Sequence, residues 1–339
     1  MKFGPVPLDA AAGGIAVHSV RAGEAVVKKG TVIGAPEVAS LRAAGIDSVV
    51  VARFEPGDVP EDEAARRLAE AAAGEGVRVE RPFTGRSNLF AEHAGVLVVD
   101  SAAVGRINAV DEAVTIATLP AYRAVEEGEM IGTVKIIPFA VPDAMLREAM
   151  AAAGATPPVR VAAFRPLRVG VVSTLLPGLK PSVIRKTIGV LQGRLGPAGA
   201  AIAFEREVPH DAAALTDALT TLASGGVDLI VVFGASAITD RRDVIPAALE
   251  RAGGRIEHFG MPVDPGNLLL IGSLGALPVL GAPGCARSPK ENGFDWVLQR
   301  LLAGLPVTRA DIVGMGVGGL LMEIVQRGHP REVHAGEGD

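Results

Sequence analysis

The sequence VVFGASAITDRRDVIPAAL, residues 231–249, changes character twice. It begins as an apolar run, breaks at Gly234 into small residues, and becomes charged from Asp240 to Asp243. Pro246 fits a following helix only in its first turn, because proline has no backbone N–H to donate further along. The pattern predicts a buried strand, a polar loop and a helix in that order.

The same alternation continues on both sides of this stretch. Strands that alternate with helices indicate a mostly parallel sheet covered on both faces. The predicted fold class of residues 165–307 is therefore α/β, a three-layer domain whose ligands bind at the carboxyl ends of the strands. We predict strands at 167–174, 200–208, 227–234, 255–260, 267–274 and 277–283, and helices at 181–195, 211–226, 242–254 and 293–305.

The first 160 residues are less regular and are predicted to form an α+β region of one or two subdomains. Segment 151–168 carries three prolines and indicates a linker. Residues 308–339 are predicted as a C-terminal helix and a tail, EIVQRGHPREVHAGEGD, without ordered structure. The N-terminal pattern predicts helices at 36–46, 61–76 and 143–154, and strands at 46–54 and 129–141.

The composition narrows the class of partner. The chain of 339 residues has a net charge of -5, one Trp and one Tyr. Nucleic-acid surfaces need clustered cations and stacking aromatics, so we expect no nucleic-acid partner. The N-terminus shows no charged leader, and no apolar run reaches membrane-spanning length. We therefore expect a soluble cytoplasmic protein with no membrane partner.

Polar residues gather in the loop after the predicted strand at 227–234. Gly234 lets the backbone approach a ligand closely, and Ser236 supplies a hydroxyl. Asp240 and Asp243 are three residues apart, so they share a face if a helix has begun. They are candidates to hold Mg²⁺ or to accept hydrogen bonds from a heterocycle. The alternative is that one of these aspartates caps the helix.

Two other strand ends carry candidate residues. Asp211 follows the strand at 200–208, either as a second acidic contact or as the N-cap of the next helix. Thr174 ends the strand at 167–174. Arg185 and Lys186 in the following helix either meet a phosphate or form a solvated face.

The segment GAPGCARSPKENGFDW, residues 281–296, is the fourth candidate. Pro283 and Gly284 predict a tight turn, and Arg287 and Ser288 then lie close to a helix start, which suits an anion. Cys285, the one cysteine of the chain, is predicted as a small filler rather than a nucleophile, because no histidine lies near it in sequence. The glycines of GMGVGGLL, residues 314–321, match a dinucleotide pattern weakly, and helix packing explains them better.

These strand-end loops, in this order, resemble the molybdopterin-binding domain shared by molybdopterin adenylyltransferases, molybdopterin molybdotransferases and gephyrin. The resemblance covers residues 167–305, and the first half resembles the molybdotransferase type more faintly. The matching segments are VVSTLLPG (171–178), VPHD (208–211), FGASAITDRRDVIPAAL (233–249), VDPGNLLLIG (263–272) and GAPGCARSP (281–289), with AVHSV (16–20), KKGTVI (28–33) and LRAAGIDSVVVARFEPGDV (41–59) in the first half.

The resemblance implies a ligand, cofactors and residue roles. The ligand is molybdopterin, with Mg²⁺ and ATP as candidate cofactors. Asp211 and Asp243 would be catalytic, and Asp243 would also bind the metal. The implied ligand-binding residues are Thr174, Gly234, Ser236 and Asp240 for the pterin, and Pro283, Gly284, Arg287 and Ser288 for its terminal phosphate.

The implied function is molybdopterin binding in molybdenum cofactor biosynthesis, with adenylyl transfer or molybdate insertion as the chemistry. Leu175 and Leu176 stand where the family has acids in its first loop, and this departure favours a non-catalytic carrier or delivery protein. The retained Asp211 and Asp243 favour an enzyme. A competence-damage-type nucleotide hydrolase on the same fold is a third alternative. The implied partners are other cofactor-biosynthesis proteins or a molybdenum enzyme, and a second copy of the chain in a homo-oligomer.

Overall fold

The structure, a computed structural model, describes residues 1–23 and 25–321. It divides into two compact units, an N-terminal unit, Met1–Ala163, and a C-terminal unit from Phe164 onward. The division falls inside the proline-containing segment 151–168 that the sequence predicts as a linker. The predicted tail, residues 323–339, lies outside the described residues.

The N-terminal unit begins with a small sheet of order β1-β5-β2 and a hydrophobic core of its own. Leu41 of helix α1 and Val51 of strand β5 are buried in this core. Helix α1 ends before Gly45, whose φ of 73° is the left-handed conformation that glycine adopts most readily. The elements are β1 (Lys2–Pro7), the 3₁₀ helix η1 (Leu8–Ala10), β2 (Ile15–Ala16), β3 (Val20–Ala22), β4 (Ala25–Val27), α1 (Ala35–Ala43) and β5 (Ser48–Arg53).

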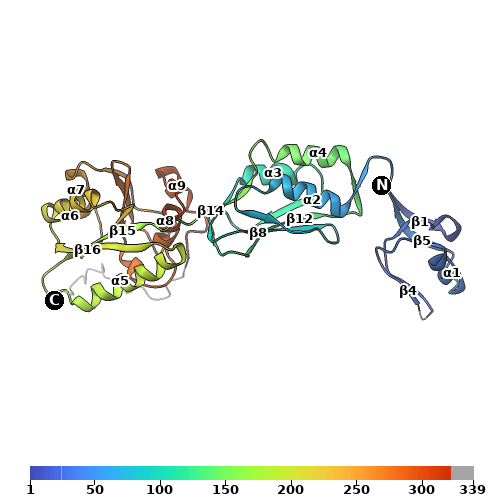
Figure 1. Ribbon diagram of the computed structural model, residues 1–339, viewed down its shortest axis with the longest axis horizontal. Coiled ribbons are helices and arrows are strands. Elements are labelled where there is room, and N and C mark those ends of the chain that lie inside the picture. Colours follow the sequence, from blue (N-terminus) through green and yellow to red (C-terminus); the bar gives the residue numbers. More distant parts are fainter. Residues whose placement is uncertain (24, 322–339) are drawn as a thin grey trace, which may run out of the picture. The chain divides into compact units, whose positions relative to one another are not determined.

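The rest of the N-terminal unit has a second core and the sheets β10-β12-β8-β7 and β11-β9-β14. Helices α2, α3 and α4 lie together on one side of β8 and β12 (Figure 1). Acidic residues fill the first turn of α2, where they complement the helix dipole. The elements are β6 (Asp58–Pro60), α2 (Glu61–Ala72), β7 (Val77–Val79), β8 (Arg86–Ala91), β9 (Gly95–Val99), α3 (Ser101–Asn108), β10 (Val114–Thr118), β11 (Ala124–Val125), β12 (Met130–Ile136), β13 (Ala140–Pro142), α4 (Asp143–Ala152) and β14 (Val159–Ala163).

The C-terminal unit contains a six-stranded sheet of order β16-β15-β17-β20-β19-β18 within its described residues. The pairs that join β16, β15, β17 and β20 are parallel, as the alternation of strands and helices predicts. Strand β19 runs antiparallel to both of its neighbours. The reason is a tight turn: Leu274 pairs with Leu277 across Gly275, so no crossover helix separates β19 from β20.

Helices cover both faces of this sheet, so the unit is an α/β fold with three layers. Helices α6 and α7 lie on one face, and α5 and α8 on the other (Figure 1). Successive residues of β17 alternate between the two cores, because Val231 packs with α5 and α8 while Val232 packs with α6 and α7. The elements are β15 (Arg168–Leu175), α5 (Pro181–Leu195), η2 (Gly196–Ala198), β16 (Ala201–Pro209), α6 (Ala212–Ser224), β17 (Leu229–Phe233), α7 (Val244–Arg251), β18 (Arg255–Phe259), β19 (Leu270–Leu274), β20 (Leu277–Ala282), η3 (Gly284–Arg287), α8 (Gly293–Leu302) and α9 (Arg309–Gly314).

The helix starts follow the sequence signals. Pro246 is the third residue of α7, so its missing N–H costs the helix no hydrogen bond. Helix α9 and the residue after it contribute Ile312 and Met315 to the core shared with α5 and α8. Ile312 and Met315 therefore pack on the α/β unit. Within the described ranges, no helix is both long and apolar enough to cross a bilayer.

Candidate functional site

Four parallel strands of the C-terminal unit end at one edge of the sheet. Strands β15, β16, β17 and β20 are direct neighbours in the order β16-β15-β17-β20, so the loops that follow them meet at this edge. Thr174 lies at the end of β15, His210 follows β16, Ser236 follows β17, and Arg287 lies in η3 after β20. Thr174, Ser236 and Arg287, which the sequence predicts as site residues, are thus brought to the edge where α/β sheets bind ligands. His210, which the sequence matched only within the VPHD segment, lies at the same edge.

A chain of hydrogen bonds connects three of these loops. Thr174 Oγ1 lies 2.8 Å from His210 Nδ1, and His210 Nε2 lies 3.0 Å from Ser236 Oγ. The backbone N–H of Ala235 donates to Thr174 Oγ1 at 2.8 Å. Thr174 is 1% exposed, His210 is half-buried, and Ser236 is exposed. The chain therefore runs from the buried strand end of β15 to a hydroxyl at the surface.

The direction of these hydrogen bonds follows from the buried threonine. Thr174 Oγ1 already accepts the N–H of Ala235, and its own hydroxyl hydrogen needs an acceptor because buried polar groups are almost always paired. Among the contacts of the described residues, His210 Nδ1 is the acceptor in reach. We therefore assign the proton of the neutral ring to Nε2, from which it is donated to Ser236 Oγ. This leaves the hydroxyl hydrogen of Ser236 directed away from His210.

Gly234 and Arg287 fix the loop that carries Ser236. A Cβ atom added at Gly234 would lie 2.7 Å from the carbonyl oxygen of Ser236 and 2.9 Å from Ile245 Cδ1, so only glycine fits. Arg287 donates from Nη2 to the carbonyl of Gly234 at 2.7 Å and from Nη1 to Thr187 Oγ1 at 3.1 Å. Burial lowers the pKa of the Arg287 guanidinium. Arg287 thus positions the Gly234 loop through two of its five N–H donors.

The aspartates predicted as catalytic make the contacts of helix caps. Asp211 Oδ1 accepts from the N–H groups of Ala213 and Ala214 at the start of α6. Asp243 Oδ1 accepts from Val244 N at the start of α7, and Oδ2 accepts from Thr239 N at 3.1 Å. These geometries match the capping alternative in the sequence.

Asp240 is paired within its own loop. Its carboxylate receives hydrogen bonds from the side chain and the backbone N–H of Arg242, which lower its pKa to about 2. Both groups of this pair are solvent-exposed, so the pair contributes little to stability.

The donor set of this loop does not fit a metal site built by the protein. Asp240 and Asp243 are the predicted ligands. The Asp240 carboxylate is paired with Arg242, and each carboxylate oxygen of Asp243 accepts a backbone N–H group. The described residues contain no cluster of three or more His, Cys, Asp or Glu side chains that could hold a metal ion. Magnesium sites need near-octahedral oxygen ligation, so we derive no chemical step through Mg²⁺ at Asp243.

The loop after β20 is held by an arginine that the sequence pattern did not single out. Arg194 on α5 pairs with Asp295 at 2.5 Å and donates to the carbonyls of Ala286 and Ser288 at 2.8 and 2.7 Å. The carbonyl of Ser288 is thereby occupied from inside the unit. Pro283 precedes η3 and is buried, while Gly284 is exposed.

Cys285 has the properties of a packed thiol. It is half-buried, and its Sγ lies 3.5 Å from Asn292 Oδ1. Burial raises the pKa of the Cys285 thiol, which keeps it protonated and poorly nucleophilic at neutral pH. This agrees with the sequence interpretation of Cys285 as a filler.

Two residues that contact the loop after β20 have no distinguishing sequence signal. Arg194 and Thr187 lie on helix α5, where the pattern indicates only one solvated face and one apolar face. By contrast Arg185 and Lys186, which the sequence did single out, are exposed near the start of α5. To identify Arg194 from the sequence, one would need to know which residues of α5 face the loop after β20. The hydrophobic periodicity of α5 does not give this information.

Comparison with known proteins gives limited matches. A family model described as a domain of unknown function, DUF8806, matches residues 5–53, which is too little of the chain to define its family. No curated protein matches. Among solved structures, the molybdopterin biosynthesis enzyme MoaB from Thermus thermophilus is 19% identical, with a TM-score of 0.31, covering 41% of this chain and 98% of that chain. At that TM-score the likeness carries no weight for the site or the function.

Proposed function

We propose that the C-terminal unit binds a molybdopterin-class ligand at the carboxyl edge of its sheet and acts in molybdenum cofactor biosynthesis as a binding or delivery protein. The observation that carries this proposal is the chain from Thr174 through His210 to Ser236. It presents the Ser236 O–H as a donor to an acceptor oxygen of a bound ligand. The order of strand-end loops that resembles the molybdopterin-binding domain is the reason to name a pterin.

The same chain supports binding over nucleophilic chemistry. In a Ser–His hydrolase, Nε2 of the histidine accepts the serine proton as the general base. Here Nε2 is assigned as the donor to Ser236, because Thr174 donates to the other ring nitrogen. Neutral His210 is therefore unable to remove the proton of Ser236 in this arrangement.

The surroundings of the site also support binding over adenylyl transfer. Phosphoryl and adenylyl transfer require cations or metal ions positioned around the phosphates. Asp211 and Asp243 make the contacts of helix caps. Leu175 and Leu176, at the end of β15, supply no side-chain oxygen. The residues that would organise a transfer step are thus either engaged or replaced.

We assign the phosphate of the ligand to the start of α5. Lys180, Arg185 and Lys186 are exposed there, beside the positive end of a 15-residue helix. Helix α5 begins shortly after β15 ends, so its first turn lies at the edge that carries Ser236. This differs from the assignment to Arg287 that the sequence resemblance implies. Two of the five N–H donors of Arg287 are directed to Gly234 and Thr187, whereas the cations at the start of α5 are exposed.

Titration calorimetry of the full chain with molybdopterin, with and without ATP and Mg²⁺, tests this function. We expect saturable binding that does not require nucleotide, with no protein-dependent release of pyrophosphate. Pyrophosphate release that depends on the protein would instead identify an adenylyltransferase. The absence of binding under every condition would overturn the assignment of a pterin ligand.

A further inference from the structure

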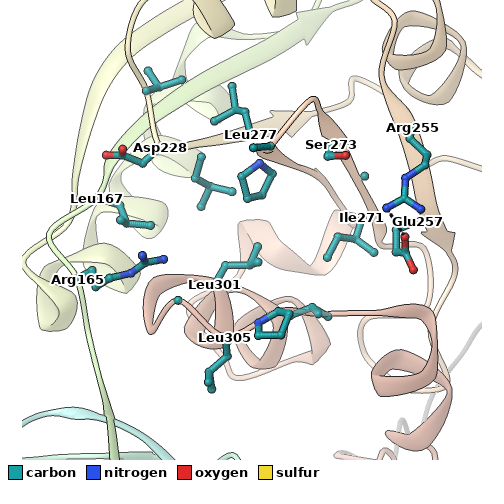
Figure 2. Close-up of a pocket in the computed structure, with 18 residues that line it drawn as sticks. Arg165, Leu167, Asp228, Arg255, Glu257, Ile271, Ser273, Leu277, Leu301 and Leu305 are labelled. Carbon is teal, nitrogen blue, oxygen red and sulfur yellow. Dashed lines mark ion pairs between the residues drawn. The ribbon is translucent and has the colours of Figure 1, made fainter.

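A cleft of about 620 Å³ opens at the other edge of the six-stranded sheet, where the parallel strands begin (Figure 2). Leu167 precedes β15, Leu229 begins β17 and Leu277 begins β20, and all three line the cleft. This volume falls in the range of small-molecule sites. The cleft is separate from the hydroxyl of Ser236, which follows the carboxyl end of β17.

The walls of the cleft are mainly apolar and come from two layers. Leu229 and Ile271 from the sheet and Leu301 from α8 are buried, and Leu277 and Leu305 are half-buried. In Figure 2, Leu301 faces the cleft from the helix side, opposite Ile271 and Leu277 on the sheet side. A ligand with a flat apolar body would displace water from both walls. This burial contributes a favourable free energy of about 25 cal/mol for each Å² of apolar surface buried.

Four charged residues line the same cleft, and three of them have partners. Arg255 pairs with Glu257 at 2.9 Å. Asp228 Oδ2 accepts the backbone N–H of Arg168 at 2.8 Å. Within the described part of the chain, the Arg165 guanidinium has no acidic side chain in ion-pairing range. Arg165 is therefore the lining cation that is available to a ligand.

Arg165 is held in place at the cleft. Its backbone N–H donates to the carbonyl of Leu302 at 2.9 Å, which ties it to the end of α8. A Cβ atom added at Gly304 would lie 2.6 Å from Arg165 Cζ, so the guanidinium lies directly against this glycine. Figure 2 shows the Arg165 side chain reaching over the helix side of the cleft, near Leu301 and Leu305.

We propose that this cleft is a second ligand site, which binds a small amphipathic anion with its apolar body between the two walls and its anionic group on Arg165. A charge-assisted hydrogen bond from a guanidinium is among the strong polar contacts in proteins. The paired charges of Arg255 and Glu257 leave the opposite end of the cleft near neutral. One anionic group on an otherwise apolar ligand therefore matches Arg165. Asp228, whose partner is a neutral backbone N–H, keeps its own negative charge in the same lining.

Two related fluorescent probes test this proposal on the full chain. 8-Anilinonaphthalene-1-sulfonate has an apolar aromatic body and one sulfonate, and N-phenyl-1-naphthylamine has the same kind of body without the charge. We expect saturable, one-to-one binding of the sulfonate. Arg165→Gln should weaken it about tenfold, as expected for the loss of a charged hydrogen bond. The neutral probe should bind less tightly and be insensitive to Arg165→Gln.

Arg168→Gln is the matched control. Arg168 is an exposed arginine whose guanidinium lies over the Phe204 ring and does not line the cleft. It should leave both affinities unchanged. Ala276→Trp, at an exposed lining position, should block both probes. Sulfonate binding that is absent, equally weakened by Arg165→Gln and Arg168→Gln, or untouched by a folded Ala276→Trp variant would overturn the proposal.

Discussion

Thr174 Oγ1 and His210 Nδ1 lie 2.8 Å apart, at the ends of the adjacent parallel strands β15 and β16. Because Thr174 also accepts the N–H of Ala235, this one contact determines which nitrogen of His210 carries the proton. That nitrogen in turn determines whether Ser236 accepts from the ring or donates to it. The role of the exposed serine is thus set by a threonine that is buried beneath the site.

The tautomer of His210 is the first prediction. Nitrogen chemical shifts of the imidazole, measured where the ring is neutral, should show Nε2 protonated and Nδ1 unprotonated. In Thr174→Val the donor to Nδ1 is lost, so the tautomer preference should weaken. A wild-type ring protonated at Nδ1 would contradict the assignment and would make Ser236 a candidate nucleophile.

Thr174→Val should also lower the free energy of unfolding, by about 1–3 kcal/mol, since it leaves the half-buried N–H of Ala235 without its acceptor. Thr174→Ser keeps the hydroxyl and should recover most of that loss. Urea unfolding of the three proteins gives the comparison. Equal stability of the valine and serine variants would show that the hydroxyl is not the stabilising group.

The capping aspartates should affect stability more than binding. Asp211→Ala and Asp243→Ala should each lower the free energy of unfolding by about 1 kcal/mol, because each removes an N-cap acceptor. Asp211→Asn and Asp243→Asn keep an acceptor oxygen and should stay close to wild type in both stability and molybdopterin affinity. Loss of binding in a stable asparagine variant would indicate that the charge itself contacts the ligand.

Gly234→Ala should disturb the Ser236 loop. The added Cβ would meet the backbone oxygen of Ser236, which is not free to move cheaply, so we expect a loss of about 1–3 kcal/mol in stability. Gly189→Ala is the matched control, because a Cβ at this position of α5 meets nothing within 4 Å. That control should gain about 0.5–1 kcal/mol from helix propensity. Thermal unfolding of both variants against wild type measures the difference.

Cys285 should react slowly with iodoacetamide in the native protein. Burial raises its pKa, so at pH 8.5 the native thiol should be alkylated more slowly than the same thiol in the urea-unfolded chain. The same raised pKa makes the folded protein less stable at high pH than at low pH. The contribution of the protonated thiol is fully present below the pKa of the unfolded thiol and is lost as pH rises through the higher folded pKa. Native alkylation as fast as in urea would contradict the burial argument.

Much of the C-terminal unit could be predicted from its sequence, because the signals there are local. Apolar runs mark the buried strands, and Asp211 and Pro246 mark helix starts at the positions where the structure has them. The direction of β19 could not be predicted, because it depends on the tight turn at Gly275. A run of apolar residues does not show which way its strand pairs.

The site was predictable in place but not in detail. The loops that carry Gly234 and Ser236 follow strand ends, and parallel strands bring such loops together. The position of Arg194 over the loop after β20 depends on how α5 packs, which no spacing in the sequence encodes. The cleft beside Arg165 is assembled from several separate segments, so it has no motif either.

The most direct test of the proposed site is the affinity of Ser236→Ala for molybdopterin, measured by calorimetry beside wild type and Ser224→Ala. Ser224 is an exposed serine at the end of α6, and its hydroxyl donates to Thr220 O within the helix, so its removal controls for the loss of a surface hydroxyl. We predict that Ser236→Ala weakens binding about tenfold, as expected for one hydrogen bond to a ligand, while Ser224→Ala binds as wild type does. Equal affinity of all three proteins would contradict a ligand site at Ser236.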